Sequence, residues 1–166
     1  MKSVVITGAN RGIGLETALA FGRAGYQVYA TMRKPKEASE LSSFVEQEAL
    51  NIALLELDVD SDESVKSCFA QVFKDTEHLD VLINNAGIER HGAIEEMDIS
   101  VFKQVMETNY FGVIRCVQAV LPKMRERGEG CIINVASVAG HISSSPLAPY
   151  SASKFALEAL SEALAQ

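Results

Sequence analysis

The sequence predicts an α/β fold, in which a doubly wound, mostly parallel sheet carries helices on both faces in three layers. Apolar runs of strand length alternate with helical patterns along the whole chain, and that order requires parallel strands joined by right-handed helical crossovers. Glycine-rich and polar segments follow directly on the apolar runs, at the strand ends where ligands bind in such sheets. With 166 residues, 48% of them hydrophobic, the chain fits a single domain over 1–166.

The composition narrows the classes of protein to which the chain can belong. The net charge of −7 argues against a nucleic-acid partner. The N-terminus enters a strand directly, without a cationic segment or a long apolar stretch, so we expect no signal peptide, no membrane span and a cytoplasmic location. Because the three cysteines and three histidines are scattered, we expect buried free thiols and no metal site.

The first half of the chain predicts four strands separated by helices. An apolar strand at 4–6 precedes a glycine-rich loop and a helix that ends near 24–25, and a branched strand at 26–31 follows. A polar helix at 36–48 leads to a third strand at 52–57. An acidic first turn at 60–63 begins a helix with one apolar face, and the fourth strand spans 79–83.

The second half predicts one long helix, one strand and a final helix. The helical pattern at 100–128 has Asn109 near a break in its middle and Pro122 close to its end. Residues 130–136 form a continuous apolar run bounded by glycine and serine, which predicts a buried strand. From Tyr150 onward, apolar residues at helical spacing among alanines predict a tightly packed helix.

The glycine-rich loop after the first strand is a candidate pyrophosphate site. Gly8, Gly12 and Gly14 have the spacing G-x-x-x-G-x-G. Glycines at this position let backbone N–H groups approach a phosphate, and the helix N-terminus favours negative charge. The spacing differs from the commonest dinucleotide pattern, so a glycine-rich turn without a ligand is the alternative interpretation.

The segment after the second strand bears on the choice of cofactor. A generic NAD site has an acidic residue on the adenosine ribose roughly 20 residues beyond the glycines. Here Arg33 stands in that neighbourhood and no acid is present. A guanidinium pairs well with a phosphate, so Arg33, together with Arg11, predicts NADP rather than NAD. The alternative is that Arg33 belongs to a solvated basic loop with Lys34 and Lys36.

Tyr150 and Lys154 are spaced to share one face of the last helix. An ammonium group held close to a phenol favours the phenolate, so such a tyrosine can give or take a proton at neutral pH. A hydroxyl from Ser137, at the end of the fifth strand, could join them in polarising a carbonyl. Taken singly, the pair is equally typical of a helix surface, and Ser137 of a helix or turn cap.

These motifs together resemble the short-chain dehydrogenase/reductase family, in its single-domain oxidoreductase type with a Rossmann-type sheet. The resemblance covers the whole chain and rests on Thr7, Gly8, Gly12, Ile13, Gly14, Asp58, Asn84, Asn85, Ala86, Gly87, Asn109, Ser137, Tyr150 and Lys154. It implies that Tyr150 is the catalytic acid and base and that Lys154 lowers its pKa and holds the nicotinamide ribose. It also implies that Ser137 positions the substrate oxygen and that Asn109 maintains a water relay to Lys154.

The resemblance further implies a cofactor site and a reaction. The residues expected to bind the cofactor are Gly8, Asn10, Arg11, Gly12, Ile13, Gly14, Arg33, Asp58, Val59, Asn85, Ala86, Gly87, Tyr150 and Lys154. The expected activity is an NADP(H)-dependent interconversion of a carbonyl and a secondary alcohol, on a small substrate of apolar character. The alternative is a truncated, non-catalytic module that binds the nucleotide cofactor.

Family members continue through a sixth and usually a seventh strand, so the domain is expected to be C-terminally incomplete. We therefore expect either a portion of a longer protein or a chain that is stable only as a homo-oligomer. By the resemblance, the helices at 109–127 and 150–166 would build the subunit interface. The apolar positions assigned to it are Phe111, Ile114, Val117, Leu121, Leu157, Leu160 and Leu164.

Overall fold

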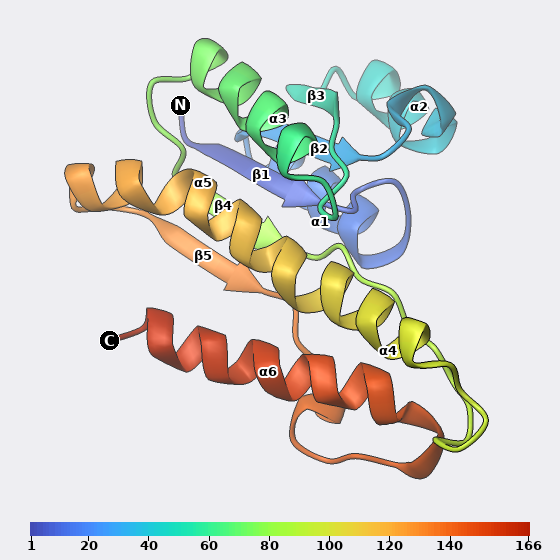
Figure 1. Ribbon diagram of the computed structural model, residues 1–166. Helices are drawn as coiled ribbons and strands as arrows, with labels where there is room; N and C mark the ends of the chain where they lie inside the picture. Colours follow the sequence, from blue (N-terminus) through green and yellow to red (C-terminus); the bar gives the residue numbers. More distant parts are fainter.

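A computed structural model describes residues 1–166 and has one sheet of five parallel strands, in the order β3-β2-β1-β4-β5 (Figure 1). The strands are β1 (Ser3–Thr7), β2 (Gln27–Met32), β3 (Ile52–Glu56), β4 (Val81–Asn84) and β5 (Cys131–Asn134). The helices are α1 (Gly12–Arg23), α2 (Ser39–Gln47), α3 (Asp62–Asp75), α4 (Ile99–Met106), α5 (Gly112–Arg127) and α6 (Ala148–Leu164). The strand order reverses between β1 and β4, which confirms the doubly wound α/β fold.

Helices cover both faces of the sheet and create two apolar cores. On one face, α1 and α2 pack over β1 and β2 through residues such as Leu19 and Leu41. On the other face, α3, α5 and α6 contribute Phe69, Val117 and Leu157 to a larger core. In Figure 1, α4, in yellow, lies beside α6, in red, and these two helices are in contact. No helix of the structure combines the length and apolar composition needed to cross a bilayer.

Two of the predicted helices are interrupted. The expected helix at 36–48 is divided into a 3₁₀ turn (Pro35–Glu37) and α2, because Ala38 between them has a non-helical backbone, with φ −87° and ψ 53°. The expected helix at 100–128 consists of α4, a π-helical segment (Glu107–Phe111) and α5. The break predicted near Asn109 is thus a turn that accommodates one extra residue.

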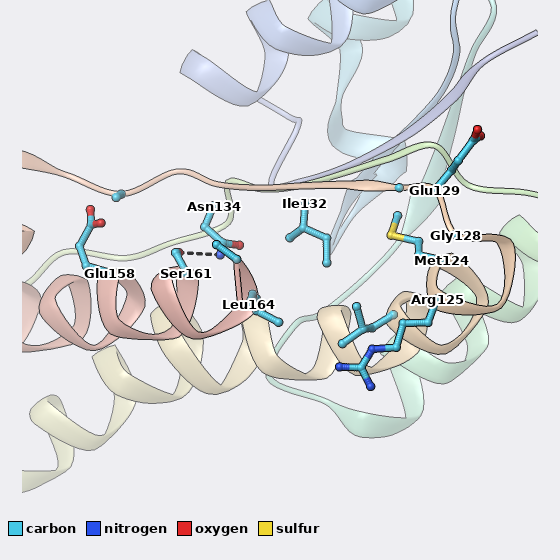
Figure 2. Close-up of a pocket in the computed structure, with 13 residues that line it drawn as sticks. Met124, Arg125, Gly128, Glu129, Ile132, Asn134, Glu158, Ser161 and Leu164 are labelled. Carbon is cyan, nitrogen blue, oxygen red and sulfur yellow. Dashed lines mark hydrogen bonds between the residues drawn. The ribbon is translucent and has the colours of Figure 1, made fainter.

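The prediction that the fifth strand is buried is wrong. β5 pairs only with β4, and Ile133 is 43% exposed. A groove of about 650 Å³ runs between β5, the end of α5 and α6 (Figure 2). Cys131 on this strand is exposed, so the expectation of buried thiols is correct only for Cys68 and Cys116. Burial raises the pKa of Cys68 to about 11 and that of Cys116 to about 12.

Asp80, which directly precedes β4, links β1 and α5 at the end of the sheet where the strands begin. Its carboxylate accepts hydrogen bonds from Ser3 N (2.8 Å), at the start of β1, and from the Arg127 guanidinium (3.0 Å), at the end of α5. Burial alone would raise the pKa of Asp80, but these contacts outweigh it and lower the pKa. The charged carboxylate therefore stabilises the fold.

We expect Asp80→Asn to lower the free energy of unfolding at neutral pH by about 1.5–3 kcal/mol, because hydrogen bonds to a charged group are lost. A lowered native pKa gives stability that is complete above the unfolded pKa of about 4 and is lost as the pH falls through the native value. The difference between variant and wild type should therefore shrink in acid. Urea unfolding across that range measures it, with Asp75→Asn at an exposed site as control; a difference independent of pH would contradict the prediction.

Candidate active site

The glycine-rich loop brings the N-terminus of α1 against the ends of β1 and β4. Gly8 has a φ of +66°, which favours glycine. A Cβ on Gly14 would lie 2.3 Å from Gly8 O and 2.5 Å from Asn85 Nδ2, so only glycine allows this close approach. The first N–H groups of α1 have no partner within the helix and are directed to the mouth of the loop, as in anion-binding sites.

Thr7 connects the glycine-rich loop to the end of β4 through hydrogen bonds. The sequence analysis did not identify this role. Its Oγ1 accepts hydrogen bonds from the N–H groups of Asn85 (3.0 Å) and Ala86 (2.9 Å). Asn85 Nδ2 in turn donates to the carbonyl oxygens of Thr7 (2.9 Å) and Gly8 (3.1 Å). The two neighbouring strand ends are thereby held at the point where the strand order reverses.

A cleft of about 920 Å³ opens at these strand ends. All the predicted cofactor residues line it except Gly14, Tyr150 and Lys154. Its remaining lining residues, which the sequence analysis did not assign to the cofactor, are Met32, Lys34, Glu37, Leu57, Asp60, Ile88, Arg90, Gln104 and Thr108. The cleft has the size and concave form of a small-molecule site.

The rim of the cleft presents positive charge beside the loop. Arg11 and Arg33 are exposed, and neither forms an ion pair with a carboxylate of the chain. Lys34 is paired with Glu37 at 2.9 Å. Asp58 accepts a hydrogen bond from Asp60 N (3.1 Å) through its carboxylate, and its own N–H donates to Ser64 Oγ (2.9 Å). Two guanidinium groups are therefore free to bind an anion such as a phosphate.

The structure brings Lys154 to Tyr150, one turn earlier on α6. Lys154 Nζ lies 5.7 Å from the centre of the Tyr150 ring and donates a hydrogen bond to Val135 O (2.7 Å). Lys154 is only 6% exposed. Its burial lowers the pKa of the ammonium group, and the charge of Glu158 opposes that shift. A buried cation beside a phenol is the arrangement that eases proton transfer from the phenol.

Asn109 links the π-helical segment to both the β4 end and α6. Its Oδ1 accepts a hydrogen bond from Ile88 N (2.8 Å), and its Nδ2 donates to Ile88 O (2.9 Å) and to Ser153 Oγ (3.0 Å). Ser153, which the sequence analysis overlooked, donates to Tyr150 O (2.7 Å). The Asn109 side chain therefore contacts the Tyr150 helix rather than Lys154 itself.

Ser137 follows β5 and caps the short 3₁₀ turn Val138–Gly140. Its Oγ accepts a hydrogen bond from Ala139 N (3.1 Å). Ser137 is therefore a turn cap, as the alternative interpretation of the sequence proposed. Capping uses the oxygen as an acceptor, so the hydroxyl proton stays available for a further acceptor.

A doubly wound parallel sheet with a glycine loop at its reversal point defines the class of Rossmann-type dinucleotide-binding proteins. Within that class, the family model described as short chain dehydrogenase matches residues 2–166. The chain belongs to the short-chain dehydrogenase family.

Sequence similarity to individual proteins supports the family assignment. The chain is 40% identical over 162 residues to a 3-ketodihydrosphingosine reductase from Bacteroides thetaiotaomicron, covering 98% of this chain and 56% of the relative. It is 40% identical over 169 residues to retinol dehydrogenase 8 from Bos taurus, covering 99% of this chain and 53% of the relative. The chain therefore spans about half the length of these curated relatives.

Solved structures show the same fold. A short-chain dehydrogenase from Streptomyces avermitilis matches with a TM-score of 0.92 and 37% identity, over 98% of this chain and 59% of the other. An actinorhodin polyketide ketoreductase solved with NADPH matches with a TM-score of 0.93 and 34% identity, over 98% and 63%. Neighbours of this kind support a nicotinamide dinucleotide as the cofactor class.

Proposed function

We propose that this chain carries the cofactor site and catalytic residues of an NADP(H)-dependent oxidoreductase that interconverts a carbonyl and a secondary alcohol. The observation that carries the proposal is the buried Lys154 ammonium 5.7 Å from the Tyr150 ring, on a helix adjoining the β4 and β5 ends. The alternative, a non-catalytic module, is not favoured, because the relatives are named as reductases and dehydrogenases.

The residues present fit a dinucleotide. Gly14 leaves no space for a side chain where the loop meets Asn85, and the α1 N-terminus faces the cleft as a pyrophosphate requires. When bound, the cofactor would supply or accept the hydride at the reacting carbon. Tyr150 would then deliver a proton to the carbonyl oxygen, or remove it from the alcohol. Lys154 would stabilise the phenolate that results, and the Ser137 hydroxyl would orient the oxygen.

NADP is proposed over NAD because of the charge at the end of β2. Arg33 and Arg11 both line the cleft and neither has an acidic partner. A 2′-phosphate would satisfy one or both guanidinium groups. The solved ketoreductase with NADPH is consistent with this choice.

The substrate is proposed to be apolar around its carbonyl. Val138 and Ile142, in the loop after Ser137, are 76% and 71% exposed, and Ile94 after β4 is 61% exposed. A hydrogen bond from Gly92 N to Pro146 O (3.1 Å) joins the two loops. The names of the relatives, retinol dehydrogenase and 3-ketodihydrosphingosine reductase, point in the same direction.

Two measurements on the same protein test the proposal. Fluorescence titration with NADPH and NADH measures binding, and NADPH oxidation with a panel of ketones and aldehydes of increasing apolar size measures turnover. We expect NADPH to bind and at least one apolar carbonyl to be reduced. Binding without turnover of any member of the panel would instead support the non-catalytic module.

We also propose that the chain self-associates or continues in a longer protein. The outer edge of β5 is unpaired, and Phe111 and Phe155 are 45% and 46% exposed on the helices expected at an interface. Val117 and Leu157, which were also assigned to that interface, lie instead in the core, at 4% and 1% exposure. Exposed edges and apolar surface favour association.

Gel filtration with light scattering should therefore find the 166-residue chain as an oligomer or a polydisperse species at micromolar concentration. Phe111→Asp, which places a charge on the exposed helix surface, should shift the distribution toward monomer. The matched control is Glu126→Asp, which leaves the apolar surface unchanged. A monodisperse monomer with one sharp thermal transition and full activity would defeat the proposal.

A further inference from the structure

A row of three polar side chains crosses the layer between the sheet and α6. Asn84 Nδ2, on β4, donates a hydrogen bond to Asn134 Oδ1, on β5 (2.9 Å). Asn134 Nδ2 donates to Ser161 Oγ, on α6 (2.9 Å). Ser161 Oγ donates to Leu157 O (2.8 Å), within the same helix. Figure 2 shows the bond between Asn134 and Ser161 at the side of the groove. We call Asn84, Asn134 and Ser161 the polar ladder.

If stability alone is considered, the polar ladder is unfavourable to folding. Asn84 is 2% exposed, and its Oδ1 has no hydrogen-bond partner. A buried polar atom without a partner costs about 1–3 kcal/mol. Asn84 and Asn134 also occupy paired positions in neighbouring strands, where apolar residues would pack without that cost. What the ladder supplies that apolar residues cannot is a directional connection from the sheet to one point on α6.

That connection is close to the buried lysine. Asn134 immediately precedes Val135, whose carbonyl accepts the Lys154 Nζ hydrogen bond (2.7 Å). Ser161 and Lys154 lie about two turns apart on α6 and therefore face the same way. The helix is thus attached to adjacent residues of one strand end at two points along its length. Two attachments resist both sliding of the helix along β5 and rotation about its own axis.

We propose that Asn134 and Ser161 are positioning residues, which hold α6 in the register that keeps Lys154 on the Val135 carbonyl and against Tyr150. Without the ladder, α6 would have the Lys154 bond as its only polar attachment to β5, and the ammonium group would exchange more often with solvent. The catalytic consequence rests on the proposed function of Tyr150 and Lys154. The positioning itself does not.

Labelling of lysine amines, mapped by mass spectrometry, tests the positioning without turnover. In the wild type, Lys154 should react far more slowly than the exposed Lys66 of the same molecule. Loss of one net hydrogen bond should open the site more often, so Ser161→Ala should accelerate Lys154 labelling about three- to tenfold at fixed pH, with Lys66 unchanged. Ser161→Thr, which keeps a hydroxyl, should restore slow labelling.

Ser151 offers a matched control on the same helix. It is 2% exposed and its Oγ has no hydrogen-bond partner. Ser151→Ala therefore removes a buried hydroxyl without removing a bond, and Lys154 labelling should keep its wild-type rate. In addition, Ser161→Ala made in an Asn134→Ala background should add little to the acceleration, because the bond between the two is already lost.

The outcomes separate this inference from the proposed function. If the wild type reduces carbonyls, Ser161→Ala should lower kcat severalfold and leave the Kd for NADPH unchanged, since the adenosine end lies on β1 to β3. If the wild type shows no turnover, the proposed function fails. The labelling result still tests whether the polar ladder positions α6. The inference would be overturned if Lys154 were labelled at the wild-type rate in the Ser161→Ala variant. It would also be overturned if Ser151→Ala accelerated Lys154 labelling as much as Ser161→Ala does. Should Ser161→Ala not fold, Ser161→Cys, whose sulfur is a weaker acceptor for the Asn134 Nδ2 hydrogen bond, must give a smaller acceleration of the same sign.

Discussion

Replacing Tyr150 with phenylalanine should reduce turnover by ~10²- to 10⁴-fold, the range that a positioned general acid contributes. The substitution removes only the hydroxyl, so the ring should keep its place 5.7 Å from Lys154 Nζ. Cofactor affinity should stay nearly unchanged, because the predicted adenosine and pyrophosphate contacts lie in the cleft beside β1, β2 and β4. Steady-state kinetics together with an NADPH titration measure both quantities.

Tyr110 provides a matched control for that experiment. It is a half-buried tyrosine whose ring packs edge-on against Phe111, with centroids 5.3 Å apart, and it has no predicted catalytic role. Tyr110→Phe should therefore retain kcat within a small factor. If Tyr150→Phe kept most of the wild-type activity, another group would have to supply the proton.

Arg33→Asp should weaken NADPH binding by at least tenfold, roughly 10- to 100-fold, and leave NADH binding equal or improved. A charge-assisted contact to phosphate contributes about 1.5–3 kcal/mol, and each 1.4 kcal/mol corresponds to about a tenfold change in Kd. Reversing the charge also adds repulsion toward the 2′-phosphate. The ratio of the two dissociation constants, measured by fluorescence titration, is the informative quantity because it cancels general damage to the site.

Lys36→Asp makes the same change of charge nearby. Lys36 is exposed but does not line the cleft, in contrast to Arg33. Its substitution should change the NADPH to NADH ratio only slightly, and less as salt is added. Equal affinities of the unaltered protein for NADPH and NADH would reduce Arg33 to an ordinary surface charge.

The features that follow from local chain geometry could be predicted from the sequence. Tyr150 and Lys154 lie together because a helix brings positions four apart onto one face, whatever surrounds it. The loop from Gly8 to Gly14 lies at the strand end because a strand and a helix flank it in the chain. Both predictions needed only neighbours in sequence.

Features that depend on distant partners could not be predicted in this way. The apolar run around Ile133 is the same whether its strand is central or at an edge, so the run by itself wrongly predicted a buried strand. Thr7 and Ser153 have roles only because β1 meets β4 and the π-helical segment meets α6. A threonine at a strand end just before a glycine loop was the one local signal that could have drawn attention to the first of these.

The π-helical segment Glu107–Phe111 changes the phase of the chain that passes through it. One residue of an α-helix turns the side-chain direction by roughly 100°, so an extra residue rotates everything beyond it by that angle. α4 packs on α6, whereas α5 packs on α3. A single uninterrupted helix would direct one continuous stripe at one neighbour. Because of the extra residue, α4 and α5 pack on neighbours that lie in different directions, although they continue from one another. Asn109 lies in the segment where this change of direction occurs.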